Sequence, residues 1–424
     1  MDAKIKDMLS FMDASPTAFH TVKNIEDRLD RAGFTWLSED KKWNIEAGGK
    51  YYVKRNGTSL IAFEVGAVGS PFMICATHSD FPLFKVKEER GGVYARLATE
   101  KYGGMIIYSW FDRPLSIAGR VILREGDTLT ERLVNIERDL LVIPSVAIHQ
   151  MRGGNDGFSP NVAVDTLPLF SLSQGKTLLS FLSGELSVAE SAIISHDLFV
   201  YPREKGTLVG VDSELILSPR IDNLECVYLS LEAFLKSEKS SLTKVYAVFD
   251  NEEVGSESKQ GAGSTFLSDT LERISPDRES YFASLAGGFM VSADNAHAKH
   301  PAHPELSDPI EAPLLSGGVV IKHNANQRYA TDAVSAAIFE KICIDGGVKV
   351  QHYSNRADMP GGSTLGTISN TKVPISTVDI GLPQLAMHSA VETAAVADAK
   401  EMKSALTRFY STSIEKQGEK IIVK

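Results

Sequence analysis

The first part of the chain alternates between helical and strand-like patterns. Apolar residues at three- and four-residue intervals predict an amphipathic helix over residues 4–13. Ser15 and Pro16 are expected to be the N-cap and first residue of a second helix, which ends near Ala32 and Gly33. The runs "SLIAFEVG" and "PFMICATHSD" then predict two strands separated by a Gly-Ser-Pro turn. The chain therefore begins as an α/β structure.

The middle of the chain has a different pattern. Between residues 85 and 215 the apolar runs are short, β-like and interrupted by Gly, Asp and Pro. They are "GVYARLA", "MIIYSWF", "SIAGRVILRE" and "RLVNIE". Residues 150–176 are rich in Gly, Asn, Asp and Ser, which indicates loops. This section is predicted to be a mostly β unit.

The last part of the chain returns to helix and strand alternation. A helix is expected after Pro219, then a strand over 244–250, a helical stretch near 261–273 and the strand "FMVSAD". The helix "DAVSAAIFEKICIDGG" and the strands "VKVQHYS" and "VPISTVDIG" follow. This alternation is typical of an α/β fold with a substantial parallel component. We therefore expect one α/β domain, 1–84 plus 216–424, interrupted by a β-rich insertion over 85–215.

Composition narrows the class of protein. The 424 residues are 43% hydrophobic and 23% charged, and the net charge is −10. Nucleic acids and anionic membranes attract basic surfaces, so neither is an expected partner. We expect neither a signal peptide nor a membrane span. The three cysteines, Cys75, Cys226 and Cys343, are widely spaced within apolar surroundings, which favours buried, reduced thiols and a cytoplasmic protein.

Candidate chemistry gathers where predicted strands and turns end. An isolated surface acid is usually only solvated, and a lone histidine usually packs in a loop. Here five separate segments each end in side chains that suit metal binding or proton transfer, and ligands of open α/β sheets bind beyond the carboxyl ends of the strands. Coincidence is therefore a poor explanation. The residues are His78, Asp80, Asp222, Glu252, Glu253, Asp294 and His388.

Paired glutamates make sense in a site for two divalent ions. Two such ions need about four ligands each, and imidazole with carboxylate suits Zn²⁺, although Co²⁺ or Mn²⁺ would also fit. A shared carboxylate can bridge the ions, and an attacking water still needs a general base that no metal occupies. Adjacent Glu252 and Glu253 could supply one metal ligand and one base. The aspartate of the "HSD" segment could hold the ligand imidazole.

The chain resembles the aspartyl aminopeptidase family of di-zinc metallopeptidases over nearly its whole length. Ten ordered blocks carry the resemblance, and their order makes it specific. They are "SPTAFHTV", "THSDFPLFKVK", "YSWFDRPLSIAGRV", "VAIHQMR", "SPRIDNL", "DNEEVGSESKQGAGS", "SADNAHAKHP", "VIKHNANQRYATD", "DMPGGSTLG" and "TVDIGLPQLAMHS". Departures from the family pattern are Asn251 where His is expected, Asn295 where Met is expected and Gly361 where Cys is common.

The resemblance implies a metal-ligand set. His78 and Asp294 are expected to bind one zinc ion, and Glu253 and His388 the other. Asp222 is expected to bridge the two.

The resemblance also implies catalytic and substrate-binding roles. Glu252 would be the general base and later proton donor, and Asp80 would orient His78. Lys322 and His297 are expected around the substrate, and His149 is expected to reach a neighbouring subunit's pocket.

Family members have a di-zinc exopeptidase-like catalytic domain with an inserted β domain for dimerisation and assembly. They form tetrahedral dodecamers built from dimers, so the resemblance predicts a homo-oligomer. The expected reaction is release of an acidic N-terminal residue from peptides. Two alternatives stay open: the same chemistry with a preference for neutral residues such as Leu, and a catalytically idle self-assembling scaffold.

Overall fold

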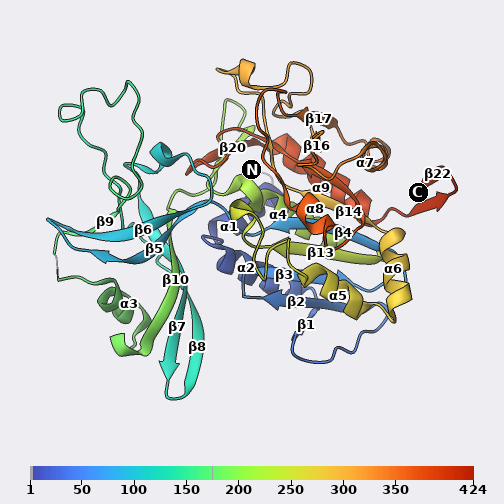
Figure 1. Cartoon of the computed structure of the whole chain (residues 1–424), viewed down its shortest axis with the longest axis horizontal. Coiled ribbons are helices and arrows are strands. Elements are labelled where there is room, and N and C mark those ends of the chain that lie inside the picture. Colours follow the sequence, from blue (N-terminus) through green and yellow to red (C-terminus); the bar gives the residue numbers. More distant parts are fainter. Residues whose placement is uncertain (1–2, 174) are drawn as a thin grey trace.

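A nine-stranded mixed sheet forms the centre of the larger part of the molecule (Figure 1). The computed structural model describes residues 3–173 and 175–424. In spatial order the strands are β1 (Thr35–Leu37), β2 (Lys50–Arg55), β3 (Ser59–Glu64), β13 (Thr243–Phe249), β4 (Phe72–His78), β14 (Phe289–Ala293), β18 (Ser376–Gly381), β16 (Val319–His323) and β17 (Val350–Ser354). The predicted α/β fold class with a mixed sheet is confirmed.

The four middle strands determine where a site can form. β13, β4, β14 and β18 are mutually parallel neighbours, whereas β2, β3 and β16 add antiparallel pairs. The carboxyl ends of the parallel strands consequently lie along one edge of the sheet, where ligands bind in open α/β folds.

Helices cover both faces of this sheet. Successive residues of a strand point to opposite faces, so alternate residues pack against different helices. Met73 and Cys75 of β4 belong to a core with one group of helices, while Ile74 and Ala76 belong to a core with the other. The first group is α1 (Ala3–Asp13), α2 (Ala18–Arg31), α4 (Ile221–Lys236), α7 (Ala333–Asp345) and α9 (Val396–Tyr410). The second is α5 (Phe266–Ile274), α6 (Arg278–Ala286) and α8 (Leu365–Asn370).

A second, six-stranded antiparallel sheet projects to one side of the molecule (Figure 1). Its spatial order is β8 (Thr128–Asn135), β7 (Leu115–Glu125), β10 (Ile193–Pro202), β5 (Leu83–Arg90), β6 (Ala95–Tyr102) and β9 (Leu169–Ser171), and α3 (Leu178–Leu186) accompanies it. The chain next forms β11 (Thr207–Val209) and β12 (Leu215–Ser218), which share a sheet with β20 (Glu392–Ala395). The domain boundaries at 84/85 and 215/216 stay predictions. The remaining strands are β15 (Ala296–His297), β19 (Pro383–Gln384), β21 (Ile414–Gln417) and β22 (Lys420–Val423).

Arg120 of β7 fastens the second sheet to the first part of the chain. Its Nε donates to Asp197 Oδ2 at 2.9 Å, and its Nη1 donates to the carbonyl oxygen of Asn56 at 3.1 Å. The guanidinium carbon also lies 4.5 Å from the centre of the Phe19 ring, which belongs to α2. A cation held by an ion pair, a carbonyl and an aromatic face gives this junction a defined geometry.

Several local predictions are wrong. "MIIYSWF" is not a strand, because Ile107–Trp110 form a 3₁₀ turn. Trp110 in this turn is buried and packs edge-on against Phe84, with ring centres 5.0 Å apart. Thr17, and not Ser15, is the N-cap residue of the second helix, although its side chain makes no capping hydrogen bond to any described residue. Ser15 donates its hydroxyl hydrogen to the Phe11 carbonyl of the preceding helix.

The predicted helical stretch near 261–273 begins as a helix only at Phe266. The middle section also contains a helix, α3, which a capping box at Thr177 and Ser180 opens. The three cysteines are buried and unpaired, as predicted. In the part of the chain that the structure describes, no helix combines the length and apolar character needed to cross a bilayer.

Candidate metal centre and active site

Three neighbouring parallel strands each deliver metal-competent side chains to the same edge of the central sheet. His78 is the last residue of β4, and Asp294 directly follows β14. Glu252 and Glu253 begin a 3₁₀ turn that two residues separate from the end of β13. The candidate site therefore lies at the carboxyl ends of the same apolar strands that the sequence predicts.

The other two candidate ligands come from less regular backbone. Asp222 lies in the first turn of α4, where its dihedral angles and those of Asn223 depart from helical values. His388 lies between β19 and β20 with φ 66°, a left-handed conformation that non-glycine residues seldom adopt. Both side chains are thereby turned out of regular structure toward the carboxyl edge of the sheet.

The five candidate ligands form two groups that share one carboxylate. In the first, His78 Nε2 lies 3.4 Å from Asp294 Oδ1 and 3.6 Å from Asp222 Oδ1. In the second, His388 Nε2 lies 3.3 Å from Glu253 Oε2 and 3.5 Å from Asp222 Oδ2. One ligand atom from each member of a group falls within 4.8 Å of the others. Each oxygen of Asp222 therefore faces a different histidine.

The electrostatics of these groups favour bound cations. Asp222 Oδ1 and Glu253 Oε1 are buried and have no hydrogen-bond partner in the described part of the chain. Burial raises the pKa of the Glu253 carboxyl to about 7, whereas a divalent cation beside it would favour the ionised form. Imidazole nitrogen with carboxylate oxygen is a donor set that suits zinc. The residues present therefore fit a zinc centre.

Glu252 stands beside this cluster but belongs to neither group. Its side-chain carboxylate accepts no hydrogen bond from any described residue, so it is free to turn toward a ligand. Burial raises its pKa well above the ordinary value, and the charges of Asp294 and Glu253 raise it further. A carboxylate with a raised proton affinity is a suitable general base.

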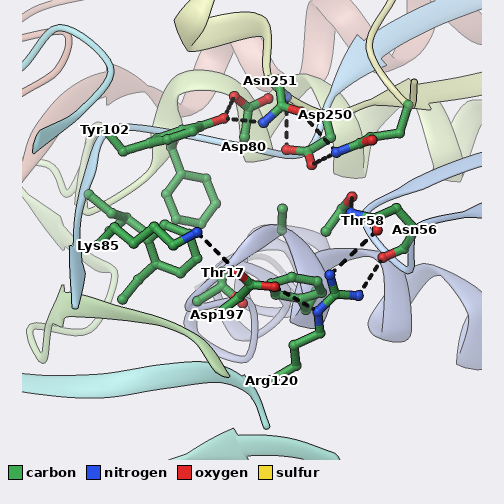
Figure 2. A pocket seen from close by; sticks show the side chains of 16 residues that line it. Thr17, Asn56, Thr58, Asp80, Lys85, Tyr102, Arg120, Asp197, Asp250 and Asn251 are labelled. Carbon is green, nitrogen blue, oxygen red and sulfur yellow. Dashed lines mark hydrogen bonds and ion pairs between the residues drawn. The ribbon is translucent and has the colours of Figure 1, made fainter. Parts of the chain in front are cut away.

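Asp80 has a wider set of contacts than the predicted one. The His78 Nδ1 lies 3.0 Å from the backbone oxygen of Asp80 but 3.6 Å from its carboxylate. The carboxylate itself accepts the backbone N–H groups of Glu252 at 3.1 Å and Glu253 at 3.2 Å. It also accepts a hydrogen bond from the hydroxyl of Tyr102 at 2.6 Å (Figure 2). Asp80 thus connects the backbone that follows His78 to the turn that carries Glu252 and Glu253.

The predicted substrate residues lie in three different settings. Lys322 is buried on β16, with Nζ 3.3 Å from Asp294 Oδ2. His297 lines a cavity of about 300 Å³ that also contains Arg356, Met359 and Met387. His149 lies on an exposed turn, and its side chain forms no hydrogen bond or ion pair within residues 3–173 and 175–424. The chain alone therefore does not bring His149 to the other two.

The sequence interpretation missed Glu392. This carboxylate is buried, and it accepts the backbone N–H of Asp222 at 3.0 Å and that of His388 at 2.7 Å. Gln384 donates to it at 3.3 Å and in turn accepts a hydrogen bond from Asn295 at 2.7 Å. No sequence motif marks Glu392, because two of its partners are backbone N–H groups and the third, Gln384, is eight residues away.

Two groups of imidazoles and carboxylates with one shared carboxylate, at the carboxyl edge of a mixed α/β sheet, suit a metal-dependent hydrolase. Comparison with known proteins narrows the class. The sequence profile described as "Aminopeptidase I zinc metalloprotease (M18)" matches residues 11–410. The chain belongs to the M18 family of zinc metallo-aminopeptidases, and the expected resemblance is confirmed.

Relatives and solved structures agree over almost the full length. A "Probable M18 family aminopeptidase 2" from Clostridium acetobutylicum is 44% identical, with 96% of this chain and 98% of the relative covered. Ape4 in its cryo-EM complex with Nbr1 has a TM-score of 0.93 and 36% identity over 96% of this chain and 85% of that one. The S. cerevisiae mApe1 dodecamer has a TM-score of 0.84 and 26% identity over 97% and 96% of the two chains.

Proposed function

We propose that this aminopeptidase uses two zinc ions and the base Glu252 to release an N-terminal residue, preferentially Asp or Glu, from peptides. The observation that carries the proposal is the position of the Asp222 carboxylate between two histidines: one oxygen faces His78 and the other faces His388. A carboxylate shared in this way matches the two-ion arrangement of many hydrolases.

His78 and Asp294 would hold one ion, Glu253 and His388 the other, and Asp222 both. Bound zinc would activate water and polarise the scissile carbonyl, and Co²⁺ or Mn²⁺ could also use these ligands.

Within this reaction Glu252 takes a proton from the attacking water and passes it to the leaving amine. The absence of other hydrogen bonds from described residues to its carboxylate and its position beside the candidate ligands support this role. Asp80 holds the backbone on both sides of the peptide bond between Glu252 and Glu253, which keeps the base and the neighbouring ligand in a fixed relation.

The substrate side chain would enter the cavity that His297 lines. An acidic side chain needs a cation nearby, which Lys322 of the same chain or His149 of a neighbouring subunit could supply. Arg356 in the cavity wall adds a positive charge, although Asp358 lies 2.8 Å from it. Met359 and Met387 in the same wall favour the second candidate, a preference for neutral residues such as Leu.

A substrate panel tests the proposal. Chromogenic Asp, Glu and Leu substrates are compared with the purified enzyme, with chelator and after metal is added back. We expect metal-dependent hydrolysis that is fastest with Asp or Glu. A strong preference for Leu would replace the acidic assignment with the neutral one.

We also propose a homo-oligomer, built from dimers into a tetrahedral dodecamer, with residues 85–215 as the inserted assembly domain. A yeast relative is a dodecamer, and exposed apolar side chains such as Tyr108 and Leu172 accompany the second sheet of this chain. Assembly would also bring His149 to a neighbouring pocket. Sedimentation at micromolar concentration tests this, and a monomer would contradict it. The three unpaired buried thiols support a cytoplasmic location.

A further inference from the structure

The second sheet reaches into the active site through Tyr102, the last residue of β6. Its hydroxyl donates to Asp80 Oδ2 at 2.6 Å and accepts a hydrogen bond from Asn251 Nδ2 at 3.0 Å (Figure 2). A phenol is protonated at neutral pH, so it can donate to a carboxylate. Tyr102 therefore connects Asp80, two residues after His78, with Asn251, directly before Glu252.

The ring of Tyr102 is held by its own sheet. It packs edge-on against Phe199 of the nearby strand β10, with ring centres 6.0 Å apart. Both residues line a cavity of about 160 Å³ between the second sheet and α2. The position of the hydroxyl thus depends on the second sheet, whereas its two partners, Asp80 and Asn251, follow strands β4 and β13 of the central sheet.

Asn251 is adapted to meet this hydroxyl. Its φ of 63° is left-handed, a region where asparagine is enriched among non-glycine residues. Its side-chain oxygen accepts a hydrogen bond from Gln260 Nε2 at 3.0 Å, which leaves the amide group to donate to Tyr102. The departure from the family pattern at this position therefore has a structural use.

The residues after Tyr102 continue along the site. Gly103 has φ 74°, and a Cβ atom there would lie 3.1 Å from the Cβ of Glu253. Farther on, Ile106 donates its backbone N–H to the carbonyl of His388 at 2.9 Å. Ser109 accepts the backbone N–H of Ala390, also at 2.9 Å. Contacts from this one segment reach both the glutamate turn and the His388 loop.

We propose that Tyr102 is a positioning residue of the active site. From the second sheet it fixes the carboxylate of Asp80, and Asp80 fixes the backbone of Glu252 and Glu253. This inference rests on the proposed function, because it assigns Glu252 the role of base. The second sheet is accordingly required for the geometry of catalysis within a single chain, apart from any contribution to assembly.

The test is a double-mutant cycle with Tyr102→Phe and Asp80→Asn, measured as kcat and KM on zinc-loaded, full-length enzyme. We expect Tyr102→Phe to lower kcat about 10- to 100-fold, the usual range for residues that orient metal ligands, and to leave KM within about threefold. The double variant should be little worse than Asp80→Asn alone, because both changes break the same interaction. Tyr94→Phe, at an exposed tyrosine before β6, is the matched control.

A kcat for Tyr102→Phe within about twofold of that for Tyr94→Phe would overturn the proposal, and so would additive losses in the cycle. Should Tyr102→Phe fail to fold, Phe199→Leu tests the same role, because it removes the ring of the second sheet against which Tyr102 packs. An unchanged kcat in that variant would count against the proposal, and a loss in kcat would support it.

Zinc affinity, measured by chelator competition, separates this inference from the proposed function. If the wild-type enzyme releases no N-terminal residue, the proposed function fails. In that case, weaker zinc binding by Tyr102→Phe than by Tyr94→Phe would still support the positioning role, and equal zinc affinities of the two variants would overturn it.

Discussion

Glu392 lies directly behind Asp222 and holds it by the main chain: Oε2 of Glu392 accepts the Asp222 N–H at 3.0 Å. The other oxygen accepts the N–H of His388 at 2.7 Å. A single buried carboxylate therefore fixes two backbone segments that carry candidate ligands. Burial raises its pKa to about 8.

Replacing Glu392 by Ala should weaken zinc binding by about 10- to 100-fold, because Asp222 and His388 lose their common anchor. Chelator competition measures the affinity. Glu419→Ala, at an exposed glutamate in the final turn, is the control and should bind zinc as the wild type does. Equal affinity in the two variants would contradict the anchoring role.

The shared carboxylate predicts a pattern of zinc stoichiometry. Elemental analysis of the wild type should find two zinc ions per chain. His78→Ala and His388→Ala should each retain one ion, whereas Asp222→Ala should lose affinity for both. His303→Ala, which changes an exposed histidine, should retain both ions. Retention of two tightly bound ions by Asp222→Ala would be incompatible with a bridging carboxylate.

Glu252→Gln should retain zinc but lose kcat by about 10²- to 10⁴-fold, the contribution expected of a general base. Glu253→Gln should instead lose zinc from one position, because that residue belongs to a ligand group. Kinetics and metal analysis on the same preparations distinguish the two glutamates. A near-wild-type kcat for Glu252→Gln would refute its role as base.

Glu225 predicts a pH dependence of stability. It is buried in α4, neither oxygen has a hydrogen-bond partner among the described residues, and burial followed by the charge of Asp398 raises its pKa from 4.5 to about 8. Between these values the folded protein holds a proton that the unfolded chain releases. The free energy of unfolding should therefore fall as pH rises through this window, by up to about 1.4 kcal/mol per unit.

Glu225→Gln keeps the size of the side chain and removes this titration. Denaturant unfolding at several pH values between 5 and 8, at a fixed metal content, should show a shallower decline for the variant than for the wild type. Glu419→Gln should follow the wild type. Parallel pH profiles for Glu225→Gln and the wild type would mean that Glu225 is ionised in the folded protein.

Much of the central sheet could be predicted because its strands are continuous apolar runs that end abruptly in polar residues. The run before His78 and the run before Glu252 show this clearly. The prediction for "MIIYSWF" is wrong because an apolar run does not fix the conformation of its backbone, and within this run Trp110 is buried whereas Tyr108 is exposed. The 3₁₀ turn is defined by backbone hydrogen bonds such as the one from the Ser109 N–H to the Ile106 carbonyl at 3.1 Å, which the residue types do not predict.

Within the site, the five candidate ligands could be recognised as residue types at strand ends or through the family resemblance. Glu392 and Tyr102 could not, because their importance lies in contacts with groups distant in sequence. A tyrosine that ends a strand in another sheet carries no local signal that its hydroxyl reaches Asp80. Such partnerships depend on tertiary packing alone.

The order of strands in the central sheet has a consequence for the newly synthesised chain. β4 lies between β13 and β14, and both neighbours are encoded far downstream. At about 5–20 residues per second, the ribosome needs roughly ten seconds or more to reach them. Until then an apolar strand that ends in His78 has no partner on either edge, so protection of this segment during translation matters for the yield of active enzyme.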